Sequence, residues 1–96
     1  MIEIRKTEHF AKWLDDLQDI RARARILTRI ERLGMGNPGD VKAVGEGVSE
    51  LRIDYGPGYR VYYIQQGRLI VILRIGGDKN TQAKDIKTAL RLARNL

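Results

Sequence analysis

The sequence predicts an α+β domain, in which a small, twisted, mainly antiparallel sheet carries a helical hairpin on one face and a further helix at the C-terminal end. Two adjacent segments near the N-terminus have apolar residues at helical spacing, and the second half alternates apolar and polar residues between glycine-containing turns. A basic amphipathic segment closes the chain. The predicted order is β-α-α-β-β-β-α, and all 96 residues (1–96) are expected to form a single domain.

A short strand and two helices account for the first third of the chain. Residues 2–5 alternate apolar and charged side chains, as a strand does. Thr7 and Asp19 each precede an apolar stripe and can cap a helix through a side-chain oxygen. The two stripes are expected to be Phe10, Trp13, Leu14 and Leu17, and Ala22, Ile26, Leu27, Ile30 and Leu33. Because the joint between them is short, the helices are expected to form a hairpin.

The second half is expected to hold three strands. A glycine-rich loop runs through residues 34–47, and Gly56-Pro57-Gly58 and Gln66-Gly67 mark the turns that separate the strands. The last strand, residues 68–75, has an unbroken apolar run at 69–73, which predicts a strand that is covered on both faces.

The final helix is expected to begin after Asn80 or Thr81 and to run almost to Leu96. Its expected apolar stripe is Ala83, Ile86, Leu90 and Ala93. Its outer face is basic, because lysines and arginines outnumber the single aspartate there.

The strands on either side of the 56–58 turn carry arginines and tyrosines. In the first strand, alternation places Leu51 and Ile53 on one face and Arg52 and Asp54 on the other. In the second strand, one face carries Tyr59, Val61 and Tyr63, and the opposite face carries Arg60 and Tyr62. Positive charge beside flat aromatic surface is suited to holding a phosphate backbone or a base.

Charge and composition narrow the function classes. The net charge of +6 favours an anionic partner, either a nucleic acid or an acidic protein. The absence of cysteine excludes a disulfide framework, a thiolate metal site and a cysteine nucleophile. The N-terminus lacks the apolar region of a signal peptide, and the longest apolar run is too short to span a membrane. We therefore expect a cytoplasmic protein.

Four segments, taken in order, resemble a known family. They are residues 36–42 (Gly-Asn-Pro-Gly-Asp-Val-Lys), 47–52 (Gly-Val-Ser-Glu-Leu-Arg), 58–63 (Gly-Tyr-Arg-Val-Tyr-Tyr), and 76–79 (Gly-Gly-Asp-Lys) with the nearby Gln82 and Asp85-Ile86. The chain resembles the RelE/ParE superfamily of toxins from bacterial type II toxin–antitoxin modules, and within it the HigB-like addiction module killer branch. The superfamily includes members that cleave mRNA and members that poison DNA gyrase.

The resemblance implies a chemistry that needs no metal or cofactor. RelE-like toxins cleave mRNA in the ribosomal decoding site, and the RNA's own 2′-hydroxyl attacks the adjacent phosphate. The protein then has to position the strand, assist proton transfer and stabilise a doubly negative phosphorane. Arginine suits the last task, because its planar donor fork matches phosphate oxygens.

Several residues take candidate roles from this resemblance. Arg60, in Gly-Tyr-Arg, matches the arginine that RelE-like enzymes place on the scissile phosphate, and Arg52 matches a basic position on the preceding strand. Lys79 lies near where those enzymes carry a further arginine, and Arg74 ends the last strand beside the same groove. The candidate RNA-binding residues are Tyr62, which could stack on a base, and Lys84 and Lys87 on the final helix.

The resemblance leaves alternatives open. RelE-like enzymes have a second basic residue on the strand before the turn, and this chain has Asp54 at that position. The only histidine, His9, lies away from the strand cluster. Arg52 and Arg60 could instead pair with Glu50 or Asp54 across the sheet. The alternatives to a nuclease are a non-enzymatic toxin that poisons gyrase or another target through its arginine-rich second helix, and a degenerate toxin that acts as an antitoxin-binding co-repressor.

The resemblance also implies binding partners. They are a cognate antitoxin, expected to be a helix-turn-helix protein encoded in the same operon, mRNA on the ribosome, and operator DNA reached indirectly through the antitoxin. No membrane partner is expected.

Overall fold

The structure, a computed structural model, describes residues 2–77 and 79–96. The elements are β1 (Glu3–Lys6), α1 (Glu8–Asp16), α2 (Ile20–Gly34), β2 (Val41–Gly45), β3 (Val48–Arg52), β4 (Arg60–Gln66), β5 (Leu69–Gly76), the short 3₁₀ turn η1 (Lys79–Thr81) and α3 (Gln82–Arg94). The predicted α+β class and the helical hairpin are confirmed, with one strand more than expected. Asp78, part of the 76–79 motif, lies outside the described residues.

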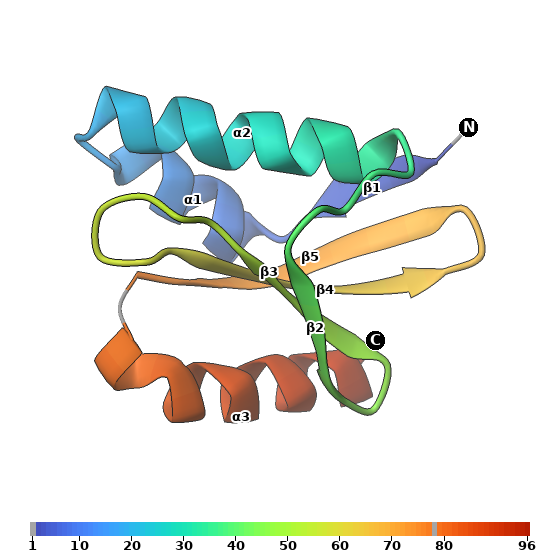
Figure 1. Cartoon of the computed structure of the whole chain (residues 1–96). Coiled ribbons are helices and arrows are strands. Elements are labelled where there is room, and N and C mark those ends of the chain that lie inside the picture. Colours follow the sequence, from blue (N-terminus) through green and yellow to red (C-terminus); the bar gives the residue numbers. More distant parts are fainter. Residues whose placement is uncertain (1, 78) are drawn as a thin grey trace.

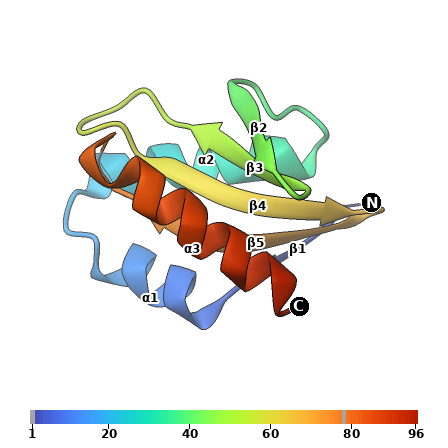
Figure 2. The ribbon, with the colours of Figure 1, turned by 90° about the horizontal axis from the view of Figure 1, so that it is seen from below.

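The strands form one sheet in the order β1-β5-β4-β3-β2. β1 pairs in parallel with β5, and the remaining neighbours pair antiparallel. The hairpin of α1 and α2 covers one face of this sheet and α3 covers the other (Figures 1 and 2). The molecule therefore has three layers, with the sheet in the middle.

Each face of the sheet has its own apolar core. Phe10, Ile26 and Leu51 belong to the larger core under α1 and α2, whereas Leu73 and Ala89 belong to the smaller one under α3. The prediction that the apolar run of β5 is covered on both faces is confirmed, because Ile70 and Ile72 enter the first core and Leu73 the second.

Two residues were wrongly predicted to lie in helical stripes. Leu27 is 38% exposed on α2, and Ala83 is exposed on α3. Ala89, which the predicted stripe of α3 omitted, is fully buried. Both errors concern residues at the border of an apolar stripe, where the position of the sheet decides which side is buried.

The additional strand is β2, which the sequence predicts to be part of a glycine-rich loop. It pairs antiparallel with β3, Val41 opposite Leu51 and Lys42 opposite Glu50. The turn that follows has Glu46 and Gly47 at positive φ, 51° and 80°. Such a turn matches the twist of a hairpin, and it lets a short segment pair with a strand that is already anchored in both cores.

A bulge in β5 decides which face its last residues occupy. Tyr62 is opposite Arg74 but Tyr63 is opposite Ile72, so Leu73 is an extra residue in β5. Strict alternation would place Arg74 on the face of Ile72, under α1 and α2. Because of the bulge, the residues after Leu73 change faces: Arg74 points toward α3, and Ile75 enters the larger core.

Candidate functional site

A pocket of about 240 Å³ opens where β3 ends and β4 begins, next to η1. We call it the Arg60 pocket. Its lining residues are Asp40, Arg52, Ile53, Asp54, Gly58, Tyr59, Arg60 and Lys79. Three of the four residues predicted to be catalytic, Arg52, Arg60 and Lys79, therefore meet in one place.

The sheet register brings the two arginines together. Arg52 and Arg60 are direct partners across β3 and β4, so both side chains leave the same face of the sheet. The connecting loop is closed by a hydrogen bond from the amide of Ile53 to the carbonyl of Tyr59, 2.9 Å long. The two arginines therefore lie side by side where the short loop joins β3 to β4.

Gly58 lies next to the stem of the third cation, Lys79. It has a φ of 88°, a backbone conformation that favours glycine, and a Cβ atom on it would lie 3.6 Å from Cε of Lys79, an ordinary contact distance. Lys79, the last residue of the 76–79 motif, begins η1. Its stem therefore lies across the turn that carries Arg60, with an exposed position for the ammonium group.

A completely buried carboxylate, that of Glu50, lies behind the two arginines. Its Oε1 is 3.0 Å from Nε of Arg52 and 3.7 Å from Nε of Arg60. Its Oε2 accepts hydrogen bonds from the Tyr62 hydroxyl, at 2.9 Å, and from Nε2 of Gln82, at 3.0 Å. Glu50 therefore connects β3, β4 and the first turn of α3.

These contacts shift two pKa values. Burial by itself raises the pKa of Glu50, but hydrogen bonds from Gln82, Arg52 and Tyr62, with the charge of Arg60, outweigh it and hold the pKa below its ordinary value. Burial, and then the hydrogen bond to Glu50, raises the pKa of Tyr62. At neutral pH the cluster holds an ionised carboxylate, a neutral phenol and two guanidinium groups.

Arg74, the fourth predicted catalytic residue, does not line the Arg60 pocket. Its Nε lies 3.0 Å from Oδ1 of Asp85, which is 3% exposed. The Thr81 hydroxyl donates to the other oxygen of Asp85 at 2.8 Å. A Cβ atom on Gly76 would come within 2.7 Å of Asp85, so the close approach of α3 to β5 needs a glycine there. This pair fastens α3 to the sheet.

The predicted RNA-binding residues also lie outside the Arg60 pocket. Tyr62 does share a face with Arg60, as predicted, but its ring is completely buried in the core under α3 and is closed to a base while α3 is docked. Lys84 and Lys87 are exposed on α3.

The sequence analysis gave no site role to three residues of this region. Asp40 and Tyr59 line the pocket, and Gln82 lies behind it, hydrogen-bonded to Glu50. The pairing of both arginines with Glu50 was one of the alternatives, and it is the one observed. The signal for it is positional: Glu50 is two residues before Arg52 and so shares its face of β3.

Within residues 2–77 and 79–96, no group of three or more histidine and carboxylate side chains is arranged to hold a metal ion. None of the helices in these residues is long and apolar enough to cross a membrane.

Comparison with known proteins gives the family. The family model described as "Phage derived protein Gp49-like (DUF891)" matches residues 12–96. The chain belongs to this Gp49-like family. A Haemophilus influenzae protein, described as uncharacterized, is 54% identical to the Gp49-like chain over 95 residues, which are 99% of this chain and 96% of that relative.

Two solved structures share the fold of this Gp49-like chain. One is described as a chromosomal ParDE TA system from P. aeruginosa, with a TM-score of 0.66, 23% identity, and coverage of 82% of this chain and 98% of that one. The other is a copper-bound mutant toxin from Helicobacter pylori, with a TM-score of 0.60, 17% identity, and coverage of 83% and 98%.

Proposed function

We propose that this Gp49-like chain is the toxin of a type II toxin–antitoxin module, of the HigB-like kind, and that it cleaves mRNA on the ribosome at the Arg60 pocket. The fold supports the toxin role, because one of the solved structures described above is of a ParDE TA system and the other is of a toxin. The observation that carries the nuclease activity is the meeting of Arg52, Arg60 and Lys79 in one open pocket.

The proposed reaction uses the RNA as its own nucleophile. The 2′-oxygen forms a bond to the adjacent phosphorus as its proton leaves, the bond to the 5′-oxygen breaks, and that oxygen takes up a proton. The products are a 2′,3′-cyclic phosphate and a 5′-hydroxyl end. The carboxylates of Asp40 and Asp54 are the acidic side chains that line the pocket and can accept the first proton.

The cations act on charge that develops in the transition state. Arg60 and Lys79 stabilise the phosphorane oxygens, and Arg52 positions the strand. Glu50 contacts the Nε edge of both arginines, and Nη1 of Arg60 donates to the carbonyl oxygen of Gly58 at 3.2 Å. The guanidinium of Arg60 is therefore held from two sides beside the pocket. A guanidinium fixed in this way need not reorganise when the reaction occurs.

The partners follow from this role. A toxin needs an antitoxin, and the net charge of +6 fits one whose binding segment is acidic. We propose a helix-turn-helix antitoxin from the same operon, which would bring operator DNA into the complex, and a cytoplasmic site of action on translated mRNA.

A second candidate is a toxin that binds gyrase or another target without cleaving RNA. The charge balance of the Arg60 pocket favours it, because Asp40 and Asp54 line the pocket and Glu50 lies behind it, against three cations. In contrast, α2 exposes most of its arginines to solvent, which offers a basic contact surface. A co-repressor without toxicity is the remaining possibility.

Induction of the toxin alone, followed by mapping of RNA 5′ ends, separates these functions. The nuclease predicts growth arrest and codon-phased cuts in translated messages, both lost in Arg60→Ala. The matched control is Arg68→Ala, which removes an exposed arginine at the β4–β5 turn and should leave the cuts unchanged. Growth arrest with intact messages and DNA damage would replace the nuclease by gyrase poisoning, and no toxicity would leave the co-repressor.

A further inference from the structure

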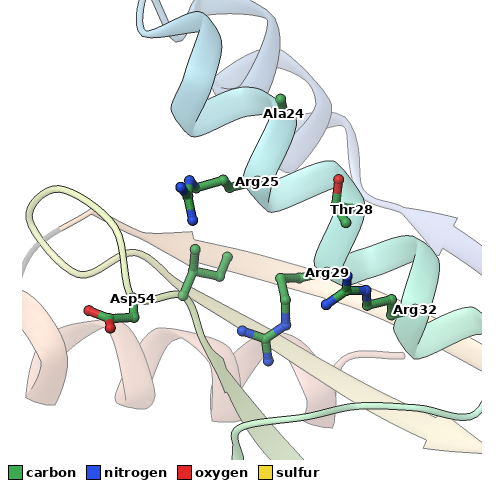
Figure 3. Close-up of a pocket in the computed structure, with 7 residues that line it drawn as sticks. Ala24, Arg25, Thr28, Arg29, Arg32 and Asp54 are labelled. Carbon is green, nitrogen blue, oxygen red and sulfur yellow. The ribbon is translucent and has the colours of Figure 1, made fainter.

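A second and larger pocket, of about 460 Å³, lies between α2 and the end of β3. We call it the α2 pocket. Three arginines of α2, Arg25, Arg29 and Arg32, line it together with Thr28, Ile53 and Asp54 (Figure 3). The arginines are spaced four and three residues apart, so they share one face of the helix.

Arg29 is built into the floor of this pocket. Its Nη1 donates to the carbonyl oxygen of Arg52, and its Nη2 donates to the carbonyls of Pro38, at 2.9 Å, and Asp40, at 3.3 Å. A Cβ atom on Gly39, whose φ is 69°, would lie only 3.1 Å from this Nη2. Carbonyl oxygens carry no net charge, so the guanidinium keeps its full positive charge.

The other two arginines offer hydrogen-bond donors at the mouth of the pocket. Arg25 and Arg32 are exposed, and within residues 2–77 and 79–96 neither has a carboxylate partner. The guanidinium of Arg25 lies 5.0 Å from the centre of the Tyr55 ring, which restrains it. In Figure 3 the carboxylate of Asp54 points away from the three arginines. The pocket thus presents a positive charge with free donors.

The α2 pocket adjoins the Arg60 pocket. Ile53 and Asp54 line both pockets, so the two cavities lie on either side of the same short segment. A ligand that fills both must carry negative groups at short, regular intervals. A single nucleic-acid strand has this property, because every nucleotide carries a backbone phosphate.

We propose that the α2 pocket binds a backbone phosphate of single-stranded RNA, next to the phosphate held in the Arg60 pocket. This inference rests on the function proposed for the Arg60 pocket. It adds a second anchoring site on α2, where the phosphate is bound and not cleaved. The α2 pocket would fix the direction in which the strand crosses the Arg60 pocket.

The test is the affinity of the purified full chain for a labelled 2′-O-methyl RNA oligonucleotide, measured by fluorescence anisotropy at several salt concentrations. The probe lacks the nucleophilic hydroxyl, so binding is read without cleavage. The pocket variant combines Arg25→Gln and Arg32→Gln. The control variant combines Arg68→Gln and Arg91→Gln, two exposed arginines outside both pockets, and so removes the same charge. Arg29 is left intact because it holds three backbone carbonyls.

Each phosphate neutralised on a single strand contributes about 0.7 to the slope of log affinity against log salt concentration. We expect the pocket variant to bind more weakly and to lose about 0.7 of the slope, while the control variant keeps the wild-type slope. Equal losses in the two variants would mean a general effect of charge and would overturn the proposal.

A third variant, Arg60→Gln, separates this inference from the function on which it rests. If Arg60→Gln weakens RNA binding and the pocket variant binds as the wild type does, the α2 site is refuted and the Arg60 site stands. If neither substitution weakens binding, both proposals fail. If the pocket variant keeps its RNA affinity and instead loses affinity for the purified antitoxin, the pocket docks an acidic protein segment, which also overturns the proposal.

Discussion

The Nε atom of Arg60 lies 3.7 Å from Oε1 of Glu50, a carboxylate that solvent does not reach. Arg52 reaches the same oxygen at 3.0 Å. One buried negative charge therefore orients two arginines on neighbouring strands. The stability of the sheet and the geometry of the Arg60 pocket depend on the same residue.

Glu50→Gln should destabilise the protein. Glutamine keeps the shape of the side chain, but it replaces one acceptor oxygen by an NH2 donor and leaves two arginines without their counterion. Loss of one partner from a buried ion pair costs about 3–5 kcal/mol, and the partial exposure of Arg52 reduces this here to about 2 kcal/mol. Urea unfolding measures the change in the free energy of unfolding. Glu46→Gln, which breaks the exposed pair with Arg94, is the control and should change little. If both variants lost a similar free energy of unfolding, the burial of Glu50 would add nothing to its contribution to stability.

The lowered pKa of Glu50 also predicts how stability depends on pH. A carboxyl group that ionises more readily in the folded state stabilises the fold above its unfolded pKa, about 4.3, and this contribution is lost as pH falls through the folded pKa. The free energy of unfolding should therefore fall less steeply below about pH 4.3 in Glu50→Gln than in the wild type. Urea unfolding at several pH values checks this. Parallel curves for the two proteins would contradict the lowered pKa.

Gly76→Ala should loosen α3. The added methyl group would come within 2.7 Å of Oδ2 of Asp85, so the helix or the aspartate has to move, and the ion pair with Arg74 weakens. Overpacking of this kind typically costs about 1–3 kcal/mol. The neighbouring Gly77→Ala is the control, because its methyl group would meet Trp13 at an ordinary 3.7 Å. Urea unfolding compares the two variants. Equal stability would mean that α3 tolerates the extra atom.

Sequence patterns correctly predicted the part of the site that lies within a single hairpin. Period-2 alternation on either side of a Gly-Pro-Gly turn placed Arg52 and Arg60 correctly with respect to Leu51 and Val61. The features that sequence could not supply depend on pairing between distant segments. β2 becomes a strand only because β3 offers an edge, and Arg74 faces α3 only because of a bulge at Leu73. The burial of Tyr62 likewise depends on where α3 docks.

Lys79→Gln should impair RNA cleavage without unfolding the protein. Lys79 is exposed and lies across Gly58 at the rim of the Arg60 pocket, so its ammonium group can reach the phosphate without supporting the core. Removal of one group that stabilises the transition-state charge typically lowers the rate about 100-fold. Single-turnover cleavage on programmed ribosomes measures the rate, and urea unfolding checks the fold. Lys12→Gln, on α1 outside the pocket, removes the same charge from an exposed position and should leave the rate unchanged. A Lys79→Gln rate equal to that of Lys12→Gln would remove Lys79 from the proposed site and leave the phosphate to the two arginines.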